Sequence, residues 1–496
     1  MFHAAPHRTS DRDLGPVRRS ARLFAGRARA AGALLLAAGT LLPTSWMGVG
    51  MVATAAASEV EAAGAELPRR VTIGLALGPD GRVATVSPEG AAAKAGVQVG
   101  DQLLRVGDVV ITKTADLVEA MRRYRGGAEM TLVGSRAAKD AAPGAEPERL
   151  ELAARLEPAP SEVVPGSKVS YGAATLPDGT RLRTILTVPE GPAPAEGSPE
   201  APRPAFFFIQ GIYCGSVDRP SVTEAADTRL ITAMAQAGFV TLRVDKSGLG
   251  DSEGPPCGDI DFATELAGYQ AALETLRNDP RVDPTRIYVF GHSMGGVMAP
   301  LLSPSDPPAG LIVYGTLGKT WFEYTLENVR RQSELFGISP ADVADAIQRE
   351  SFIGSVVYIQ KKTVGDAWAL KPEWKEPNPM LEAERIATRH VRFFHQLQDI
   401  NIARAWQDSP SPMLAIHGEY DWVAGREDHE IIVGVANQAR EGSATLVDLP
   451  GLDHGLTKHQ SLQSSLAGMG RGAWDSALPE AILSWIRGLE GARPTP

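Results

Sequence analysis

Short apolar segments alternate with amphipathic segments over residues 165–490. Uninterrupted apolar runs, among them "AFFFIQG", "RIYVFG" and "GLIVYG", lie between segments in which apolar residues recur every three or four positions. Runs of this length are typical of buried strands, and the longer period is typical of the helices that cover them. Strands that alternate with helices form parallel sheets. We therefore predict an α/β sheet here, opened by a β-hairpin at "KVSYGAATLPDGTRLRTILTVPEG".

A block of roughly 90 residues interrupts this alternation between "GLIVYG" and "PMLAIHG", which is too long for a plain connection. Three segments of the block have helical periodicity: "WFEYTLENVRRQSELF", "SPADVADAIQRESFIGSVVYIQKK" and "LEAERIATRHVRFFHQLQ". We interpret residues 320–405 as a helical cap above the carboxyl ends of the strands.

Residues 70–157 have a different pattern, with short alternating segments, glycine turns and one amphipathic helix at "TADLVEAMRRY". The stretch "SPEGAAAKAGVQVGDQLLRVGD" resembles the PDZ domains of bacterial envelope proteases. The resemblance implies that the backbone N–H groups around Gly74 and Leu75 receive the C-terminus of a peptide, which adds as a strand to the sheet edge. The alternative is a unit that only packs against its neighbour and binds nothing.

The first 58 residues have the pattern of an export signal. Arginines precede the uncharged stretch "AAGALLLAAGTLLPTSWMGVGMVATAAAS", which ends in small residues suited to cleavage. Its apolar core is short for a membrane-spanning helix and Pro43 follows it, so a cleaved signal peptide is favoured over a retained anchor. We expect the rest of the chain to reach the periplasm or cell envelope, with a membrane contact only if this segment is retained.

Composition narrows the class of partner. The chain has 496 residues and a net charge of −10, which argues against nucleic acid or an anionic membrane as its main partner. Its only two cysteines, Cys214 and Cys257, provide no zinc-type spacing, so we expect no metal site. An exported chain could join these two cysteines in a disulfide, and two free thiols are the alternative.

Two G-x-S-x-G matches supply candidate nucleophiles. In "GHSMGG", Ser293 directly follows an apolar strand and a helix begins at once after it, which predicts a strand–turn–helix elbow that exposes the hydroxyl group. In "GDSEG", Ser252 lies well beyond its strand, and Pro255 and Pro256 prevent a following helix. We therefore predict Ser293 as the nucleophile and Ser252 as an ordinary loop residue.

A serine nucleophile needs a histidine base and an acid that orients the histidine. In "LAIHGEYDWV", Asp421 lies just past one predicted strand, and in "LPGLDHGL", His454 lies just past the next. Both side chains should therefore reach the sheet edge that holds the serine. Competing residues are Glu419 in the first loop, Asp453, which we interpret as a solvated loop residue, and His292, which we expect to pack rather than react.

The motifs "FFFIQG", "RVDKSGLGDSEG", "GHSMGG", "HGEYDWV" and "GLDH" resemble the α/β-hydrolase superfamily over residues 165–490, and most of all its serine-aminopeptidase and esterase branch. The resemblance implies an oxyanion hole made by the backbone N–H groups of Met294 and Ile212. Gln210 departs from the family, whose members often carry histidine there. The resemblance also places both cysteines in loops that flank the site.

These features favour an exported serine hydrolase that cleaves carboxylic esters without a metal or organic cofactor. A serine exopeptidase is an alternative, with cap residues Glu323, Glu327 and Glu334 available to bind a substrate amine, although acidic residues on helices usually face solvent. A second alternative is an envelope adaptor that uses the PDZ-like domain and retains an inert hydrolase half.

Overall fold

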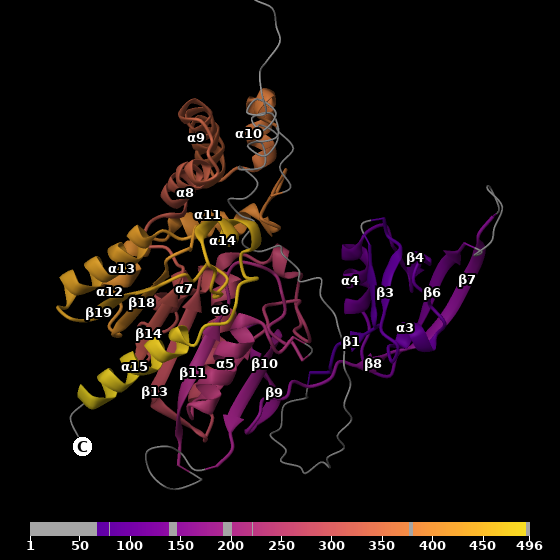
Figure 1. The fold of residues 1–496 in the computed structure, drawn as a ribbon, viewed down its shortest axis with the longest axis horizontal. Helices are drawn as coiled ribbons and strands as arrows, with labels where there is room; N and C mark the ends of the chain where they lie inside the picture. The colour runs from indigo at the N-terminus through magenta and orange to yellow at the C-terminus, as the bar shows by residue number, and fades with distance from the viewer. Residues whose placement is uncertain are drawn as a thin grey trace, which may run out of the picture.

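The computed structural model describes residues 67–492 except residues 79, 138–145, 192–200, 221 and 376–379. The predicted export signal lies outside the described residues. The described chain forms a smaller N-terminal domain and a larger C-terminal domain that carries a helical cap (Figure 1). None of the helices in this part of the chain combines the length and the apolar character needed to cross a membrane.

The C-terminal domain is built on an eight-stranded mixed sheet with strand order β19-β18-β14-β13-β11-β12-β10-β9. The strands are, in chain order, β9 (Ser167–Thr175), β10 (Arg181–Pro189), β11 (Arg203–Ile209), β12 (Val240–Val244), β13 (Val282–His292), β14 (Gly310–Tyr314), β18 (Met413–Gly418) and β19 (Ala444–Leu449). The β9–β10 hairpin is antiparallel, as is the β10–β12 pair, and all other neighbours are parallel. The α/β sheet predicted from the sequence is confirmed.

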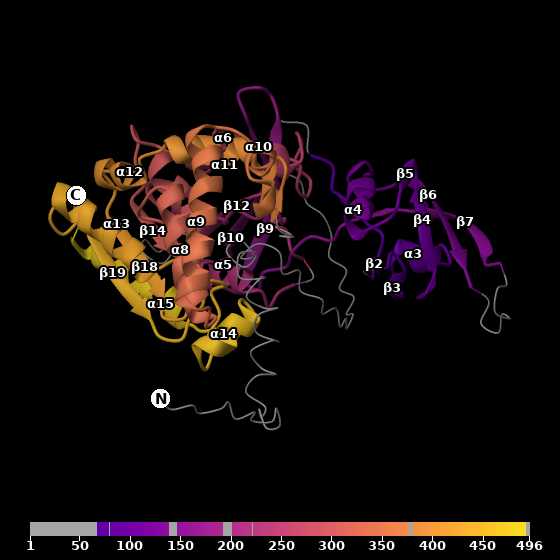
Figure 2. The same ribbon diagram turned by 90° about the horizontal axis from the view of Figure 1, so that it is seen from above.

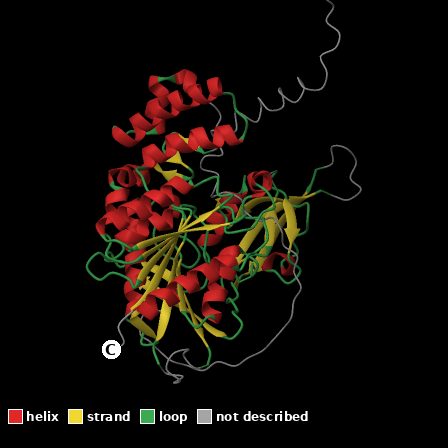
Figure 3. Ribbon diagram, turned by 60° about the vertical axis from the view of Figure 1, so that its left-hand side comes forward, coloured by secondary structure: helices red, strands yellow, loops and turns green. Residues whose placement is uncertain are grey.

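Helices cover both faces of this sheet (Figure 3). They are α5 (Ala226–Gln236), α6 (Phe262–Arg277), α7 (Met294–Met298), α13 (Arg426–Ala439) and α15 (Ala477–Ala492), and a further helix, α14 (Leu462–Gly468), lies between β19 and α15 in the chain. Strand β11 shows why its apolar run is continuous. Phe206 and Phe208 pack in the core beneath α5 and α15, whereas Phe207 and Ile209 pack in the core beneath α6 and α13. A strand buried on both faces has no polar side to alternate with its apolar side.

The cap lies above the carboxyl ends of the parallel strands, with α8 and α9 stacked side by side (Figures 1 and 2). Its helices are α8 (Trp321–Leu335), α9 (Pro340–Gly354), a π-helical turn (Ser355–Ile359), α10 (Val364–Leu370), α11 (Val391–Asp399) and α12 (Ile402–Asp408). Short 3₁₀ turns lie at Cys257–Asp259, Ala299–Leu301 and Pro372–Trp374.

One part of the predicted cap is wrong. Residues 381–390 were expected to be helical, but they form three short antiparallel strands, β15 (Leu381–Glu382), β16 (Arg385–Ile386) and β17 (Arg389–His390). Ala387 and Thr388 have positive φ angles of 49° and 68°, which no α-helix accommodates. The turn places the fully buried Arg389 against Glu265 of α6, a long-range ion pair that the local sequence pattern does not report.

The N-terminal domain contains a four-stranded sheet, a separate two-stranded sheet and two helices around its own apolar core. Its elements are β2 (Leu75–Leu77), β3 (Val83–Val86), α3 (Ala91–Lys94), β4 (Gln102–Val106), β5 (Val109–Val110), α4 (Thr114–Arg122), β6 (Glu129–Arg136) and β7 (Glu148–Arg155). The predicted small β-rich unit is therefore confirmed.

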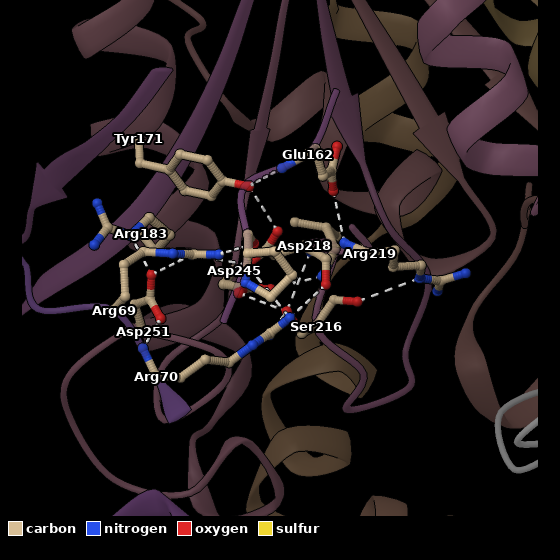
Figure 4. A network of polar contacts seen from close by, with 12 residues as sticks. Arg69, Arg70, Glu162, Tyr171, Arg183, Ser216, Asp218, Arg219, Asp245 and Asp251 are labelled. Carbon is tan, nitrogen blue, oxygen red and sulfur yellow. Dashed lines mark hydrogen bonds and ion pairs between the residues drawn. The ribbon is translucent and has the colours of Figure 1, made fainter. Parts of the chain in front are cut away.

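The chain enters and leaves the N-terminal domain at one junction, where β1 (Val71–Thr72) pairs with β8 (Glu157–Pro158). The residues before β1 lie in the surface of the C-terminal domain: Leu67 is 2% exposed, and Arg69 forms ion pairs with Asp218 at 2.8 Å and with Asp251 at 2.6 Å. Figure 4 shows this network of arginine and carboxylate side chains. The junction is therefore polar and ordered rather than a loose linker.

Candidate active site

Ser293 occupies a sharp turn between β13 and α7. Its φ and ψ angles are 53° and −121°, a strained conformation for a residue with a Cβ atom. The neighbouring glycines make the turn possible. A Cβ atom on Gly291 would lie 2.5 Å from the carbonyl oxygen of Gly295, and one on Gly295 would collide with that of Ile209. The motif "GHSMGG" thus requires small residues around a serine that is held at the top of the sheet.

Asp421 and His454 lie in the loops that follow β18 and β19 and form a buried pair. His454 Nδ1 donates to Asp421 Oδ2 at 2.9 Å. The other carboxylate oxygen accepts from the backbone N–H groups of Val423 at 2.9 Å and Ala424 at 2.8 Å. Burial raises the pKa of Asp421, but the nearby imidazole and these hydrogen bonds outweigh burial and lower that pKa to about 2. The carboxylate is therefore ionised at neutral pH and fixes the orientation of the imidazole.

Strand β14 connects the serine turn to this pair. The carbonyl oxygen of Tyr314 accepts from the backbone N–H of Ser293 at 2.9 Å. The next residue, Gly315, packs directly on the pair, because a Cβ atom there would lie 2.7 Å from Asp421 Oδ2 and 2.8 Å from His454 Nδ1. The structure therefore brings all three predicted triad residues to one edge of the sheet.

His292 also contributes to this arrangement, which the sequence alone did not reveal. Its Nε2 donates to the backbone carbonyl of His454 at 2.8 Å, and the two rings have centroids 5.0 Å apart. Burial and the neighbouring His454 lower the pKa of His292 to about 4, so its imidazole is neutral at pH 7. His292 therefore anchors the loop that carries His454.

The competing residues are engaged elsewhere. The Ser252 hydroxyl donates to the carbonyl of Asp245 at 2.9 Å and accepts from the backbone N–H of Arg183 at 2.8 Å. Glu419 is exposed and accepts from the backbone N–H of Gly451 at 2.8 Å. Both residues serve to fix the loops that contain them.

The prediction that Asp453 is a solvated loop residue is wrong. Its side chain is fully buried and accepts from His459 Nε2 at 2.9 Å and from the backbone N–H of Thr457 at 3.0 Å. A carboxylate with this many local donors is stable without solvent. Asp453 therefore shapes the histidine loop and does not contact the imidazole of His454.

The two predicted oxyanion donors belong to backbone segments next to Ser293. Met294 is the first residue of α7, so its N–H group has no acceptor within the helix. Ile212 lies in the loop after β11, where the preceding Gly211 is so close that a Cβ atom on it would lie 3.2 Å from Ser293 Cβ and 3.6 Å from its Oγ. Both backbone segments therefore adjoin the hydroxyl group.

Cys214 and Cys257 are joined by a disulfide with an S–S distance of 2.04 Å. The bond connects the loop after β11 to the 3₁₀ turn that precedes α6. It therefore restrains the same loop that carries Ile212.

The acidic cap residues do not gather into a binding site. Glu323, Glu327 and Glu334 are all exposed on α8; Glu327 pairs with Lys319, and Glu334 lies 4.0 Å from Arg330. Among the described residues there is no cluster of three or more histidine, cysteine or acidic residues that could hold a metal ion.

The predicted peptide-binding loop has the geometry of an open sheet edge. Gly74 has a φ angle of 72°, and a Cβ atom there would lie 2.7 Å from the Cα atom of Gly90. Leu75 begins β2, whose sheet contains only β3 as a further strand in the described part of the chain. One edge of β2 therefore carries no strand.

Two family models match the chain. Residues 225–460 match the family described as serine aminopeptidase, S33, and residues 82–133 match the PDZ domain family. The chain is an α/β hydrolase with an N-terminal PDZ domain. The hydrolase match includes Ser293, Asp421 and His454.

Individual relatives of the hydrolase domain are distant. Esterase EstD of Thermotoga maritima is 20% identical over 302 residues, which are 61% of this chain and 64% of that protein. Quorum-quenching protein AidA of Acinetobacter baumannii is 28% identical over 115 residues, 20% of this chain and 38% of that protein. This chain therefore spans less than two thirds of each of these curated relatives.

A solved structure of Est1E from Butyrivibrio proteoclasticus with bound ferulic acid aligns with 64% of this chain and 99% of that chain. The sequence identity is 19% and the TM-score is 0.40.

Proposed function

We propose that the protein is an exported serine hydrolase that cleaves carboxylic esters. The observation that carries the proposal is the convergence of a serine on a strained elbow with a carboxylate-bound imidazole at one sheet edge. Distant similarity to a named esterase supports the reaction class.

In the proposed reaction, Ser293 Oγ attacks the ester carbonyl carbon while His454 Nε2 accepts the hydroxyl proton. The backbone N–H groups of Met294 and Ile212 donate to the oxygen that becomes negatively charged. Collapse of the tetrahedral intermediate breaks the ester bond, and His454 returns the proton to the leaving alcohol. Water then attacks the acyl-enzyme with the same base, which releases the acid and restores the serine.

The proposed location outside the cytoplasm rests on the uncharged segment that follows the arginines near the N-terminus. The Cys214–Cys257 disulfide supports it, because such bonds persist in oxidising compartments. We also propose that the PDZ domain binds a peptide C-terminus at Gly74 and Leu75 by adding a strand to the free edge of β2.

A serine exopeptidase is the second candidate, because the matched family model is described as an aminopeptidase. An exopeptidase must also bind the terminal amine of its substrate. Glu323, Glu327 and Glu334 are exposed and give this candidate no support.

The test is labelling by a fluorophosphonate probe of the purified chain, of Ser293→Ala and of Ser252→Ala. We expect labelling to be lost only in Ser293→Ala. Initial rates on carboxylic esters and on aminoacyl amides then distinguish the two candidates. A folded wild-type chain that reacts neither with the probe nor with any of these substrates would leave only the adaptor function of the PDZ domain.

A further inference from the structure

Lys246 is buried behind the loop that carries Ile212. It follows β12, and its side chain is 1% exposed. Its ammonium group donates to the carbonyl oxygen of Gly211 at 2.6 Å and to that of Tyr213 at 3.3 Å. A buried cation is therefore bonded to two main-chain carbonyls within three residues of one loop.

The carbonyl of Gly211 and the N–H of Ile212 belong to the same peptide unit. In a trans peptide these two groups point in opposite directions, and the structure contains no cis peptide among its described residues. An ammonium group bound to the oxygen therefore fixes the direction in which the N–H points. It also polarises the peptide unit, which makes the N–H a stronger hydrogen-bond donor.

This peptide unit adjoins the nucleophile. The Cα atom of Gly211 is close enough to Ser293 that an added Cβ atom would lie 3.2 Å from the serine Cβ. Gly295, in the same elbow as the serine, packs against the carbonyl oxygens of Ile209 and Gln210. The loop is thus pressed between the serine elbow and Lys246.

The ion pairs around Lys246 do not by themselves account for a lysine here. Glu265 of α6 pairs with Lys246 at 2.8 Å, but the same carboxylate also binds the fully buried Arg389. Either cation alone would neutralise Glu265, and a second buried cation is costly. The nearby Asp245 carboxylate accepts instead from Ser216 Oγ and from the backbone N–H of Val217. The surplus positive charge therefore faces the carbonyls of Gly211 and Tyr213.

We propose that Lys246 is a positioning residue for the oxyanion hole, which acts by holding and polarising the Gly211–Ile212 peptide unit. This inference rests on the proposed function. Lys246 does not touch the substrate; it orients the Ile212 N–H toward the developing oxyanion and adds a positive field behind it. The quoted motif "RVDKSGLGDSEG" contains this lysine, but its partners lie in the loop after another strand.

The central experiment compares Lys246→Met with Arg389→Met. Each variant replaces one of the two cations on Glu265 with an unbranched apolar side chain, but only Lys246→Met frees the two loop carbonyls. Arg389 reaches this loop only through the Cys214–Cys257 disulfide, which Arg389→Met leaves intact. For Lys246→Met we expect kcat on an ester to fall about 100-fold or more, with KM changed less than about three-fold, because an oxyanion donor acts mainly in the transition state. For Arg389→Met we expect kcat within a few-fold of wild type.

Binding of a boronic acid, whose adduct with Ser293 places an oxygen in the oxyanion hole, provides a second readout. We expect its affinity to fall in Lys246→Met in proportion to kcat and to be little changed in Arg389→Met. Equal losses of kcat in the two variants, or an unchanged kcat in Lys246→Met, would overturn the inference. An inactive wild-type chain that binds no boronic acid would instead overturn the proposed function itself.

A pH profile keeps the inference testable if Lys246→Met does not fold. Burial lowers the pKa of Lys246 to about 8; Glu265 from α6 opposes this shift and Arg389 from β17 adds to it. We expect kcat of the wild type to fall as pH rises through about 8 and this fall to be absent in Lys246→Arg, whose guanidinium keeps its charge. The same high-pH profile in both proteins would contradict the inference.

Discussion

At the residue scale, Asp421 keeps its charge in a buried position because several groups donate to its two oxygens. Its folded-state pKa of about 2 lies below the value of an unfolded aspartate. Its ionisation therefore stabilises the fold above the unfolded pKa, and this stability is lost as pH falls toward 2. We expect Asp421→Asn to lower the free energy of unfolding by roughly 2 to 3 kcal/mol at pH 6.

The same difference between wild type and Asp421→Asn should shrink steadily between pH 4 and pH 2, because the wild-type carboxylate becomes protonated over that range. Urea unfolding of both proteins across this series provides the measurement. A difference that does not change with pH would show that the carboxylate charge is not what stabilises the loop.

Asp421→Asn is also expected to lower kcat by about 10³- to 10⁴-fold while the protein remains folded at pH 7. An amide cannot hold the imidazole in the tautomer that accepts the serine proton at Nε2. The matched control is Glu419→Gln in the same loop, whose carboxylate binds Gly451 rather than the imidazole. Steady-state kinetics on one ester check both variants. A comparable loss of kcat in Glu419→Gln would mean that the assignment of Asp421 as the acid is wrong.

At the element scale, the turn between β13 and α7 depends on the absence of side chains. A Cβ atom on Gly296 would collide with Thr316, whose hydroxyl donates to the carbonyl of Ser293 at 2.8 Å. We expect Gly296→Ala to destabilise the protein by about 1 to 3 kcal/mol and to abolish labelling of Ser293 by a fluorophosphonate.

Gly434 in α13 is the matched control for this substitution, because a Cβ atom there would meet nothing within 4 Å. Gly434→Ala should leave labelling intact and raise stability by up to about 1 kcal/mol, as expected for a helix interior. Thermal unfolding and probe labelling of both variants check the prediction. Intact labelling in Gly296→Ala would show that the elbow tolerates a side chain.

The Cys214–Cys257 disulfide restrains the loop after β11, which lies next to the site. Cys214 and Cys257 are 43 residues apart in sequence. Closure of a loop of this size stabilises the fold by about 2 to 4 kcal/mol. We expect Cys214→Ser/Cys257→Ser to lose that much stability in urea unfolding and to lose kcat more than substrate affinity, because the loop that carries Ile212 is loosened. An unchanged kcat would mean that Lys246 alone suffices to hold this loop.

The elements could be predicted from the sequence where burial alone determines them. The apolar runs of β11, β13, β14 and β18 are covered on both faces, so the apolar pattern alone is enough to predict these strands. The segment 381–390 contains residues that favour a helix. It forms strands instead because the buried Arg389 binds Glu265, which lies more than a hundred residues away in the sequence. Local periodicity contains no information about such a partner.

The same distinction applies to the site. The order of Ser293, Asp421 and His454 along the chain predicted which side chains the structure brings together, since each follows a strand of one sheet. The burial of Asp453 and the contacts of His292 and Lys246 were not predictable. These depend on which backbone groups of another loop lie within hydrogen-bond distance, and no spacing in the sequence encodes that.

At the scale of the whole molecule, the two domains are connected by a segment whose charged side chains bond to the hydrolase domain. Arg70 before β1 donates to Ser216 Oγ at 2.7 Å and to the carbonyl of Asp218 at 2.7 Å. Ser216 Oγ in turn donates to Asp245, which directly precedes Lys246. The segment after β11 is therefore held at its far end by the chain that leads into the PDZ domain (Figure 4).

The strongest expected effect at this junction belongs to Arg69, which pairs with two carboxylates that are 1% and 0% exposed, those of Asp218 and Asp251. Removal of one partner from a buried ion pair leaves uncompensated charge, and Arg70 and Arg183 compensate only partly. We therefore expect Arg69→Met to lower the free energy of unfolding by about 2 to 4 kcal/mol.

The matched control is Arg123→Met on the PDZ surface, where the partner Asp108 is exposed, and it should have no measurable effect on stability. Urea unfolding followed by tryptophan fluorescence reports on the hydrolase domain, which holds seven of the eight tryptophans, and circular dichroism follows the PDZ domain, which holds none. Wild-type unfolding of the hydrolase domain in Arg69→Met would mean that the ion pairs of Arg69 with Asp218 and Asp251 do not stabilise that domain.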